Sequence, residues 1–278
     1  MSAGKNSFKF NTNMILIAVM LIGIGLILYP SVSDYWNSYH QTRAIVSYNE
    51  TVSSIDTAAF EEMWEKASAY NETLLREDNR YYLDEEEEET YDSLLNITGT
   101  GIMSYVEIKK LNISLPIYHG TDESVLQIAI GHIPGTSLPV GGESTHCVIS
   151  GHRGLPSARL FTEIDQLEKG DTFLVQTLGE TLTYEVDQIR IVLPHELDDI
   201  EIEEGKDYCT LVTCTPYGIN SHRLLVRGHR IENAKEHIHV TADAAQIDYR
   251  FPAIIIAAIL SIIAGIVMMI LSSLRRRA

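Results

Sequence analysis

Residues 207–218 read DYCTLVTCTPYG, a β-prone run that leads directly to Cys214. Pro216 and Gly218 follow at once, so the strand is expected to give way to a loop just after this cysteine. A cysteine at the end of a strand can lie at the mouth of a barrel, within reach of a substrate. The other two cysteines, Cys147 and Cys209, fall inside predicted strands and are expected in the core. We therefore favour Cys214 as the reactive thiol, with a buried inert cysteine as the alternative.

Several short strand candidates surround this run, with two short helices between them. The predicted strands are 105–108, 111–118, 146–150, 172–177, 181–192, 207–213 and 224–231. Leu178-Gly179-Glu180 predicts a hairpin turn between two of them, and the helices are expected at 123–130 and 158–167. Pro116 cannot donate to a ladder, so its strand is expected at an edge or to end early. Many short strands with few helices indicate a mainly β fold, a closed barrel or a sandwich.

The segment before the strands is predicted to be helical. Residues 33–77 space their apolar side chains three and four apart, and Asp56 and Thr57 offer a helix cap. This segment is expected between the membrane and the main domain, and a plain helical stalk is the alternative. The unbroken acidic run 84–89 repels itself, which is typical of a solvated loop. Residues 78–100 are therefore interpreted as a linker or flap.

Two apolar stretches indicate a membrane protein. Residues 252–274 meet the length of roughly 20 residues that a bilayer requires, and 14–29 lie at the short end of that range. Lysines precede the first stretch and three arginines follow the second, a pattern that keeps both ends cytoplasmic. Residues 31 to about 250 are then extracytoplasmic. A cleaved signal peptide with a site near Ser31-Val32-Ser33 is the alternative for the first stretch.

The charge distribution argues against nucleic acid as a partner. The net charge is −17, and the terminal segments carry five positive charges without any acidic residue, so the middle carries −22. Phosphate requires a surface of the opposite sign. The predicted organisation therefore joins a membrane-bound chain to an acidic ectodomain. A tail and first transmembrane helix (or signal sequence) occupy 1–30, a helical segment 31–77 and an acidic linker or flap 78–100. A mainly β domain follows at 101–235, then a juxtamembrane linker at 236–251 and a second transmembrane helix with a basic tail at 252–278.

A cysteine nucleophile requires a proton-transfer partner and a group that stabilises an oxyanion. Among ten histidines, His152 is favoured because it follows a predicted strand and is flanked by Gly151 and Gly154. A surface-loop histidine is the alternative. Arg223 and Arg227 share a face of their strand and lie roughly 14 Å apart, so only one can reach a given oxyanion. A solvated surface charge is the alternative for each arginine.

Taken together, these segments resemble the sortases, in particular the pilin-polymerising class C. The family signature Thr-Leu-x-Thr-Cys is matched by residues 210–214, and an arginine follows the cysteine by nine positions, at Arg223. The family histidine matches His152 in its Ser-Gly-His-Arg context. The segment 115–121, LPIYHGT, and the two transmembrane ends also resemble that class. The resemblance covers about 103–231.

The resemblance implies a sortase-like closed β-barrel with short helices. It also implies a transpeptidase that cleaves a Leu-Pro-x-Thr-Gly-like sorting signal between threonine and glycine. Cys214 would form the thioacyl intermediate, His152 would transfer protons, and Arg223 would stabilise the oxyanion or position the substrate. Thr213 is assigned to substrate binding, and no cofactor or metal is expected. The partners would be pilin or surface proteins carrying the sorting signal, and the acceptor a pilin lysine.

One departure from the class and three alternatives remain. Class C sortases often carry an Asp-Pro-aromatic lid motif, but this chain has no proline between Pro30 and Pro116. A lid anchor to Arg223 and an aromatic cover over Cys214 therefore cannot be assigned. The alternatives are a sortase that anchors proteins to the cell wall, a cysteine peptidase that hydrolyses its substrate, and a non-catalytic binding domain tethered to the membrane.

Overall fold

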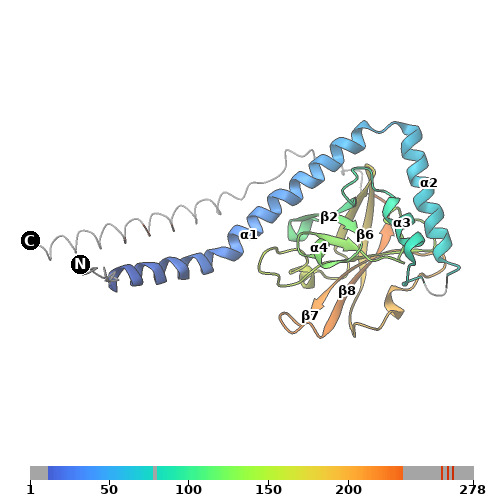
Figure 1. The fold of residues 1–278 in the computed structure, drawn as a ribbon. Helices are drawn as coiled ribbons and strands as arrows, with labels where there is room; N and C mark the ends of the chain where they lie inside the picture. The colour runs from blue at the N-terminus through green and yellow to red at the C-terminus, as the bar shows by residue number, and fades with distance from the viewer. Residues whose placement is uncertain (1–11, 78–79, 234–257, 259–261, 263–264, 266–278) are drawn as a thin grey trace, which may run out of the picture. The chain divides into compact units, whose positions relative to one another are not determined.

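The computed structural model describes residues 12–77 and 80–233, together with the isolated positions 258, 262 and 265. The chain divides into two units, Met1–Ile238 and His239–Ala278. The predicted juxtamembrane linker 236–251 lies outside the described residues, as does the second apolar stretch 252–274 except at those three positions, which are helical. All the elements below belong to the first unit (Figure 1).

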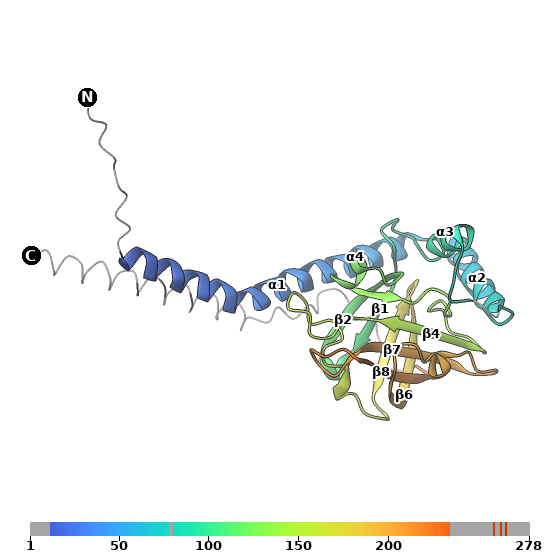
Figure 2. The ribbon, with the colours of Figure 1, turned by 60° about the horizontal axis from the view of Figure 1, so that its bottom comes forward.

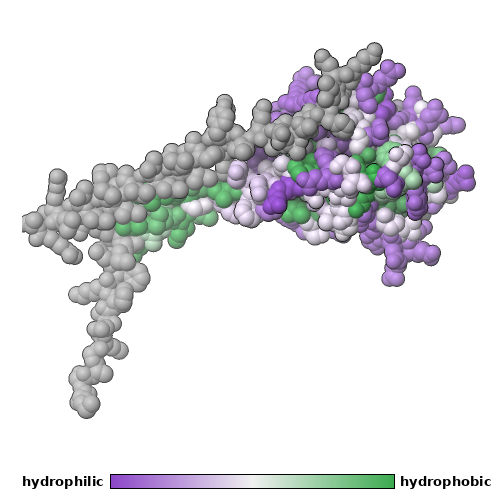
Figure 3. All heavy atoms as spheres, turned by 90° about the horizontal axis from the view of Figure 1, so that it is seen from above, coloured by the Kyte–Doolittle hydropathy of each residue, from purple (hydrophilic) through white to green (hydrophobic). Residues whose placement is uncertain are grey.

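The N-terminal apolar stretch and the first part of the predicted helical segment form one continuous helix, α1 (Thr12–Ser54), with Pro30 inside it. From Ile15 onward, α1 is long and apolar enough to cross a membrane. The part of α1 that projects from the barrel presents an apolar surface (Figure 3). Its C-terminal half lies beside the barrel, where it contacts strands β1 and β2 (Figures 1 and 2).

Tyr48 fixes α1 to the barrel through a buried hydroxyl. That hydroxyl donates to the backbone oxygen of Met103 at 3.0 Å and accepts from the backbone N–H of Leu178 at 2.8 Å. Burial raises the pKa of Tyr48. The hydroxyl therefore stays neutral and satisfies two backbone groups that would otherwise be buried without partners.

Helix α2 (Thr57–Leu74) begins where the sequence predicts. Asp56 is its N-cap, and the Asp56 carboxylate accepts from the N–H of Ala59 at 2.8 Å. On its buried face, Asn71 donates to the oxygen of Leu138 and accepts from the N–H of Leu138. This pair of bonds holds α2 against the loop before β4.

The acidic run is helical, so its interpretation as a loop was wrong. Helix α3 (Glu85–Ser93) begins with a capping box, in which Asp84 accepts from the N–H groups of Glu86 and Glu87 while Glu87 accepts from the N–H of Asp84. Carboxylates in a first turn are stabilised by the exposed N–H groups and the helix dipole, which offsets their mutual repulsion. Tyr91 then buries its ring against the barrel.

Eight strands form a closed barrel, which confirms the predicted mainly β closed barrel. Around the barrel the order is β1-β2-β3-β4-β7-β8-β6-β5, and β5 pairs with β1 to close it. The pairs β2–β3 and β4–β7 are parallel, and the others are antiparallel. The strands are β1 (Ile102–Ile108), β2 (Ile113–His119), β3 (Ile130–His132), β4 (Thr145–Ser150), β5 (Thr172–Thr177), β6 (Glu180–Val192), β7 (Asp207–Thr215) and β8 (His222–Ile231).

The predicted hairpin turn between β5 and β6 is present. Leu178 and Gly179 both have positive φ, at 50° and 88°, which is the conformation that a two-residue hairpin loop requires. Pro116 pairs with Tyr105 of β1 on one side, while β3 joins β2 on the other side only from Ile117 onward. Among the described strands, Pro116 therefore faces no ladder partner on the β3 side, which is how a closed barrel accommodates it.

The short helices differ from the expectation. Residues 123–130 divide into helix α4 (Glu123–Leu126) and the start of β3. Residues 158–167, expected as a helix, form turns with a single 3₁₀ turn, η2 (Ile164–Gln166). Leu160 adopts a positive φ of 38°, which interrupts any helix there. Two more 3₁₀ turns are η1 (Lys109–Leu111) and η3 (Asp198–Ile200).

Candidate active site

The β7–β8 hairpin places Cys214 and Arg223 directly opposite each other. Their Cα atoms are partners in the antiparallel ladder, so both side chains leave the same face. Directly opposed residues have Cβ atoms about 4.5–5.5 Å apart. The interval of nine residues between them is thus spanned by one hairpin, and a thiol and a guanidinium project side by side.

His152 reaches the same end of the barrel through the parallel pair β4–β7. Ser150 is the ladder partner of Val212, and the N–H of Gly151 donates to the oxygen of Val212 at 3.0 Å. His152 therefore lies two residues past Ser150, just as Cys214 lies two residues past Val212. The structure brings all three predicted residues to one rim.

Cys214 lies on the outer face of β7. Side chains alternate along a strand, so Cys214 shares its face with Val212. Val212 belongs to an apolar cluster that is separate from the main core. We call this the outer cluster; its members are Val148, Val192, Ile200, Val212 and Leu225, with Tyr81 and Ile133 packed on it. Cys214 is half-buried at the end of this apolar surface.

Thr213 points to the other face of β7, inside the protein. It is buried, and its hydroxyl donates to the backbone oxygen of Gly151 at 2.7 Å. This bond ties the residue before Cys214 to the residue before His152. The structure thus gives the Thr213 hydroxyl an internal partner, and its assignment to substrate binding stays a prediction.

Two glycines shape the loop that carries His152. A Cβ on Gly151 would lie 2.7 Å from Ile130 and 2.8 Å from Phe161, and Gly154 has a positive φ of 74° with the Tyr217 ring lying against it. The backbone oxygen of His152 accepts from the N–H of Phe161 at 3.1 Å. The Nε2 atom of His152 is buried and has no hydrogen-bond partner among the described residues.

Arg153 is a rim residue that sequence reasoning missed. It donates to the hydroxyl of Thr215 at 3.3 Å, forms an ion pair with Asp165 and lies over the Tyr217 ring. It therefore links the loop that carries His152 to the residue that follows Cys214. Its position beside His152 was visible in the sequence, but its three partners were not.

The arginines of β8 differ in their hydrogen-bond and ion-pair partners. Arg227 binds Asp187 through two hydrogen bonds of 3.0 Å, and its guanidinium lies 4.0 Å from the centre of the Tyr208 ring. Among the described residues, Arg223 forms no ion pair and donates only to the backbone oxygens of Asn220 and His222, at 3.4 and 3.2 Å. Arg223 is thus the β8 arginine that is both beside Cys214 and free of a carboxylate.

Cys147 and Cys209 lie in the core, as predicted. They are ladder partners in β4 and β7, and both are buried. Burial raises the pKa of the Cys209 thiol well above its ordinary value, so this thiol stays protonated. Of the three cysteines, only Cys214 is exposed to solvent to an intermediate extent.

The segment before α3 covers part of the outer cluster. Arg80 forms an ion pair with Glu201 of the β6–β7 loop, and the Tyr81 hydroxyl donates to the same carboxylate at 3.3 Å. The Tyr81 ring packs on the outer cluster. This segment therefore lies across the apolar surface that ends at Cys214.

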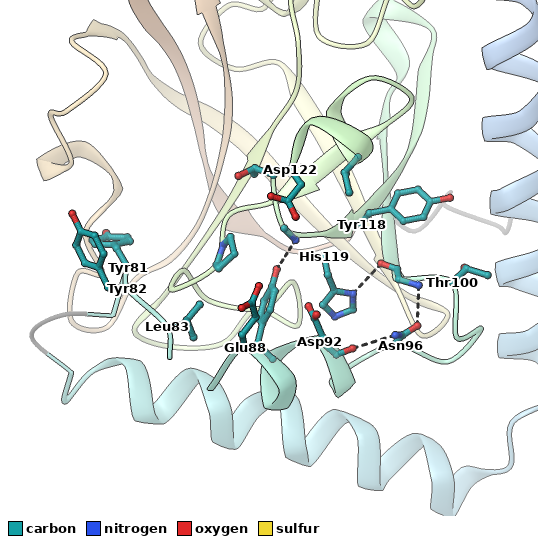
Figure 4. Close-up of a pocket in the computed structure, with 16 residues that line it drawn as sticks. Tyr81, Tyr82, Leu83, Glu88, Asp92, Asn96, Thr100, Tyr118, His119 and Asp122 are labelled. Carbon is teal, nitrogen blue, oxygen red and sulfur yellow. Dashed lines mark hydrogen bonds between the residues drawn. The ribbon is translucent and has the colours of Figure 1, made fainter. Parts of the chain in front are cut away.

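A separate cavity of about 530 Å³ lies between α3, residues 81–83 and the end of β2 (Figure 4). Figure 4 shows Glu88 and Asp92 of α3 and Asp122 after β2 around it. None of the three rim residues lines this cavity. It is therefore not part of the candidate active site.

Comparison with known proteins agrees with this geometry. A family model described as "Sortase domain" matches residues 106–231. The crystal structure of sortase C1 from Streptococcus agalactiae is 52% identical, with a TM-score of 0.67, and the match covers 69% of this chain and 100% of that one. The chain belongs to the sortase family. The prediction of a sortase enzyme resembling class C is therefore confirmed at the level of the family.

Two further relatives support the assignment to the sortases. Sortase C of Streptococcus pneumoniae is 45% identical, with a TM-score of 0.62, over 69% of this chain and 97% of that one. Sortase D of Bacillus subtilis (strain 168) is 34% identical over 130 residues, which are 45% of this chain and 62% of that protein. The chain thus spans less than two thirds of this curated sortase.

Proposed function

We propose that this sortase is a cysteine transpeptidase with Cys214 as nucleophile. The observation that supports it most is the meeting of Cys214, Arg223 and His152 at one rim, from β7, β8 and the loop after β4. A thiolate, a proton-transfer group and a cation are the set that acyl transfer requires. The two other cysteines are buried in the core and cannot serve.

In the proposed reaction, the Cys214 thiolate attacks the threonine carbonyl of a Leu-Pro-x-Thr-Gly-like signal. The Arg223 guanidinium stabilises the oxyanion or positions the substrate backbone. His152 donates a proton to the departing glycine amine, which leaves a thioester on Cys214. An incoming amine then attacks the thioester, His152 takes its proton, and an amide bond forms as Cys214 is released as the thiolate. The outer cluster offers an apolar surface next to Cys214 for the signal.

The proposed partners are pilin or surface proteins that bear the sorting signal. The structures similar to this chain include several class C sortases, and the S. pneumoniae structure is titled with reference to pilin substrate specificity. We extend that substrate class to this chain as a proposal, with a pilin lysine as acceptor. Attachment to the cell wall is the alternative. Helix α1 would anchor the enzyme with the barrel outside the cell, so that membrane-tethered substrates meet it at raised effective concentration.

Product analysis tests the transpeptidase against the peptidase. The full chain in detergent is given a fluorescent sorting-signal peptide, with and without an added primary amine. We expect mass spectrometry to find the threonine joined to the amine. A product that is always the free threonine acid, at a rate independent of amine, would favour a peptidase. The absence of any cleavage would favour a binding domain.

We also propose that the segment from Arg80 to Tyr81 acts as a flap over the outer cluster. Replacing Arg80 with alanine removes the ion pair to Glu201. Because such a pair contributes about 1 kcal/mol, the flap should open about fivefold more often. We expect the rate of peptide joining to rise by a similar factor. Alkylation of the half-exposed Cys214 by a small reagent should change little.

Lys66 provides a matched control for this test. Its ion pair with Glu62 lies exposed on α2, far in sequence from the rim. Lys66→Ala should leave joining unchanged. If Arg80→Ala joined peptide at the wild-type rate, Tyr81 would not obstruct the path to Cys214, and the flap would be rejected.

A further inference from the structure

C-terminal to the apolar stretch, one face of α1 is hydrogen-bonded to the barrel domain. Asp34 accepts from the N–H of Arg159 at 2.8 Å, Asn37 donates to the oxygen of Ser157 at 2.8 Å, and Gln41 donates to the oxygen of Ile128. Spacings of three and four place these side chains on one side of the helix. These three hydrogen bonds fix the rotation of residues 34–41 of α1 about the helix axis, relative to the barrel.

The opposite face of α1 carries large exposed side chains. At 3.6 residues per turn, Tyr29, Val32, Trp36 and Tyr39 fall on the side away from Asp34 and Asn37. Trp36 is 63% exposed and Tyr39 50%, and Tyr29 and Val32 are also exposed. We call these four residues the aromatic face. Exposed aromatic side chains of this kind favour a partner in which an apolar layer lies next to a polar one.

The positions of charged residues predict where the aromatic face lies relative to a bilayer. No charged residue occurs between Lys9 and Asp34. The part of this stretch within α1, residues 12–33, is about 33 Å long at 1.5 Å per residue, enough for a hydrocarbon core of about 30 Å. Trp36 and Tyr39 follow Asp34 by two and five positions, so they lie about 3 and 8 Å further along the axis. Tyrosine and tryptophan are enriched at this headgroup level.

We propose that the aromatic face contacts the lipid headgroup region of a bilayer and thereby seats the active-site rim at the membrane surface. The link to the rim is short, because the loop bound by Asp34 and Asn37 continues to Phe161, whose N–H donates to the oxygen of His152. Gly154 also donates to the hydroxyl of Thr162. The inference rests on the proposed membrane anchor, and it is independent of the transpeptidase chemistry.

Fluorescence quenching by brominated lipids tests this proposal. The chain has two tryptophans, Trp36 and Trp64, and Trp64 packs against the barrel core. The full chain is placed in phosphatidylcholine vesicles brominated either near the headgroup or near the chain ends. We expect a loss of fluorescence that is larger with the shallow bromine. In Trp36→Phe, where Trp64 alone reports, that loss should disappear without any change to the core.

Flotation separates the two ways in which the test can fail. If the wild-type chain does not float with the vesicles, the membrane anchor itself is rejected. If the chain floats but neither brominated lipid quenches Trp36, the aromatic face does not contact lipid and the inference is overturned. A cross-linked dimer that Trp36→Ala abolishes, found together with unquenched Trp36, would assign the face to a second copy of the chain.

Discussion

Replacing Cys214 with alanine is expected to abolish both joining and the thioacyl intermediate. Without the sulfur there is no atom at the end of β7 that can form the thioester, and neither core thiol can reach the outer face. Removing the nucleophile of a comparable catalytic unit costs about 10⁴-fold or more in rate. The measurement is mass spectrometry of the intact enzyme after a sorting-signal peptide is added. Wild type should gain the mass of the acyl fragment, and Cys214→Ala should gain nothing.

Cys147→Ala and Cys209→Ala are the matched controls. Both thiols are buried partners in β4 and β7, so their loss should lower the free energy of unfolding while the acyl adduct still forms. The three variants thus separate a defect of chemistry from a defect of packing. An acyl adduct on Cys214→Ala, or joining by it near the wild-type rate, would show that another group is the nucleophile.

The barrel was predictable because its strands carry their own signals. Alternation and β-branched residues locate β5, β6 and β7 to within two residues, and Leu178-Gly179 marks the turn. Strand β3 was missed since three residues, Ile130–His132, are too few to show a period of two. It exists because β2 and β4 flank it and satisfy its backbone, which is a property of the assembled sheet.

The two errors in helix prediction have opposite causes. For α3, charge repulsion was given more weight than the capping box of Asp84 and Glu87, although both residues were visible in the sequence. For 158–167, apolar spacing suggested a helix, but the segment is held in turns by bonds to other elements. The N–H of Phe161 is bound to His152, and that of Arg159 to Asp34 of α1. Such long-range partners cannot be read from local sequence.

Some residues of the candidate site were predictable from the sequence, and others were not. Cys214 and Arg223 are opposed across one hairpin, but the residues alone left both Arg223 and Arg227 open, and the choice of Arg223 came from the interval of nine in the family pattern. His152 joins them through the parallel β4–β7 pair, whose partners Ser150 and Val212 are 62 residues apart. Its place after a strand and between two glycines favoured it, and the family resemblance supported that choice. The contacts of Arg153 with Asp165 and of Arg80 with Glu201 had no sequence signal.

Replacing His152 with glutamine is expected to slow joining by about 10²- to 10⁴-fold, the usual contribution of a proton-transfer group. Its Nε2 is buried without a partner among the described residues, so the substitution breaks no hydrogen bond of that atom within the fold. Glutamine keeps a polar side chain but cannot exchange a proton near neutral pH. The measurement is the rate of joining of a sorting-signal peptide to an amine by wild type and variant at one fixed pH.

His195→Gln is the control for this experiment, because it makes the same substitution at a histidine that is exposed on the β6–β7 loop. It should keep the rate of wild type. A change of substrate distinguishes proton donation by His152 from a purely structural role. Because its first task is to protonate the departing amine, a sorting signal with a thioester or ester in place of the scissile amide needs less proton donation. Such a substrate should acylate His152→Gln much faster than the amide does. Equal losses with both substrates would instead mean that His152 only holds the rim in shape, and the proton-transfer role would be withdrawn.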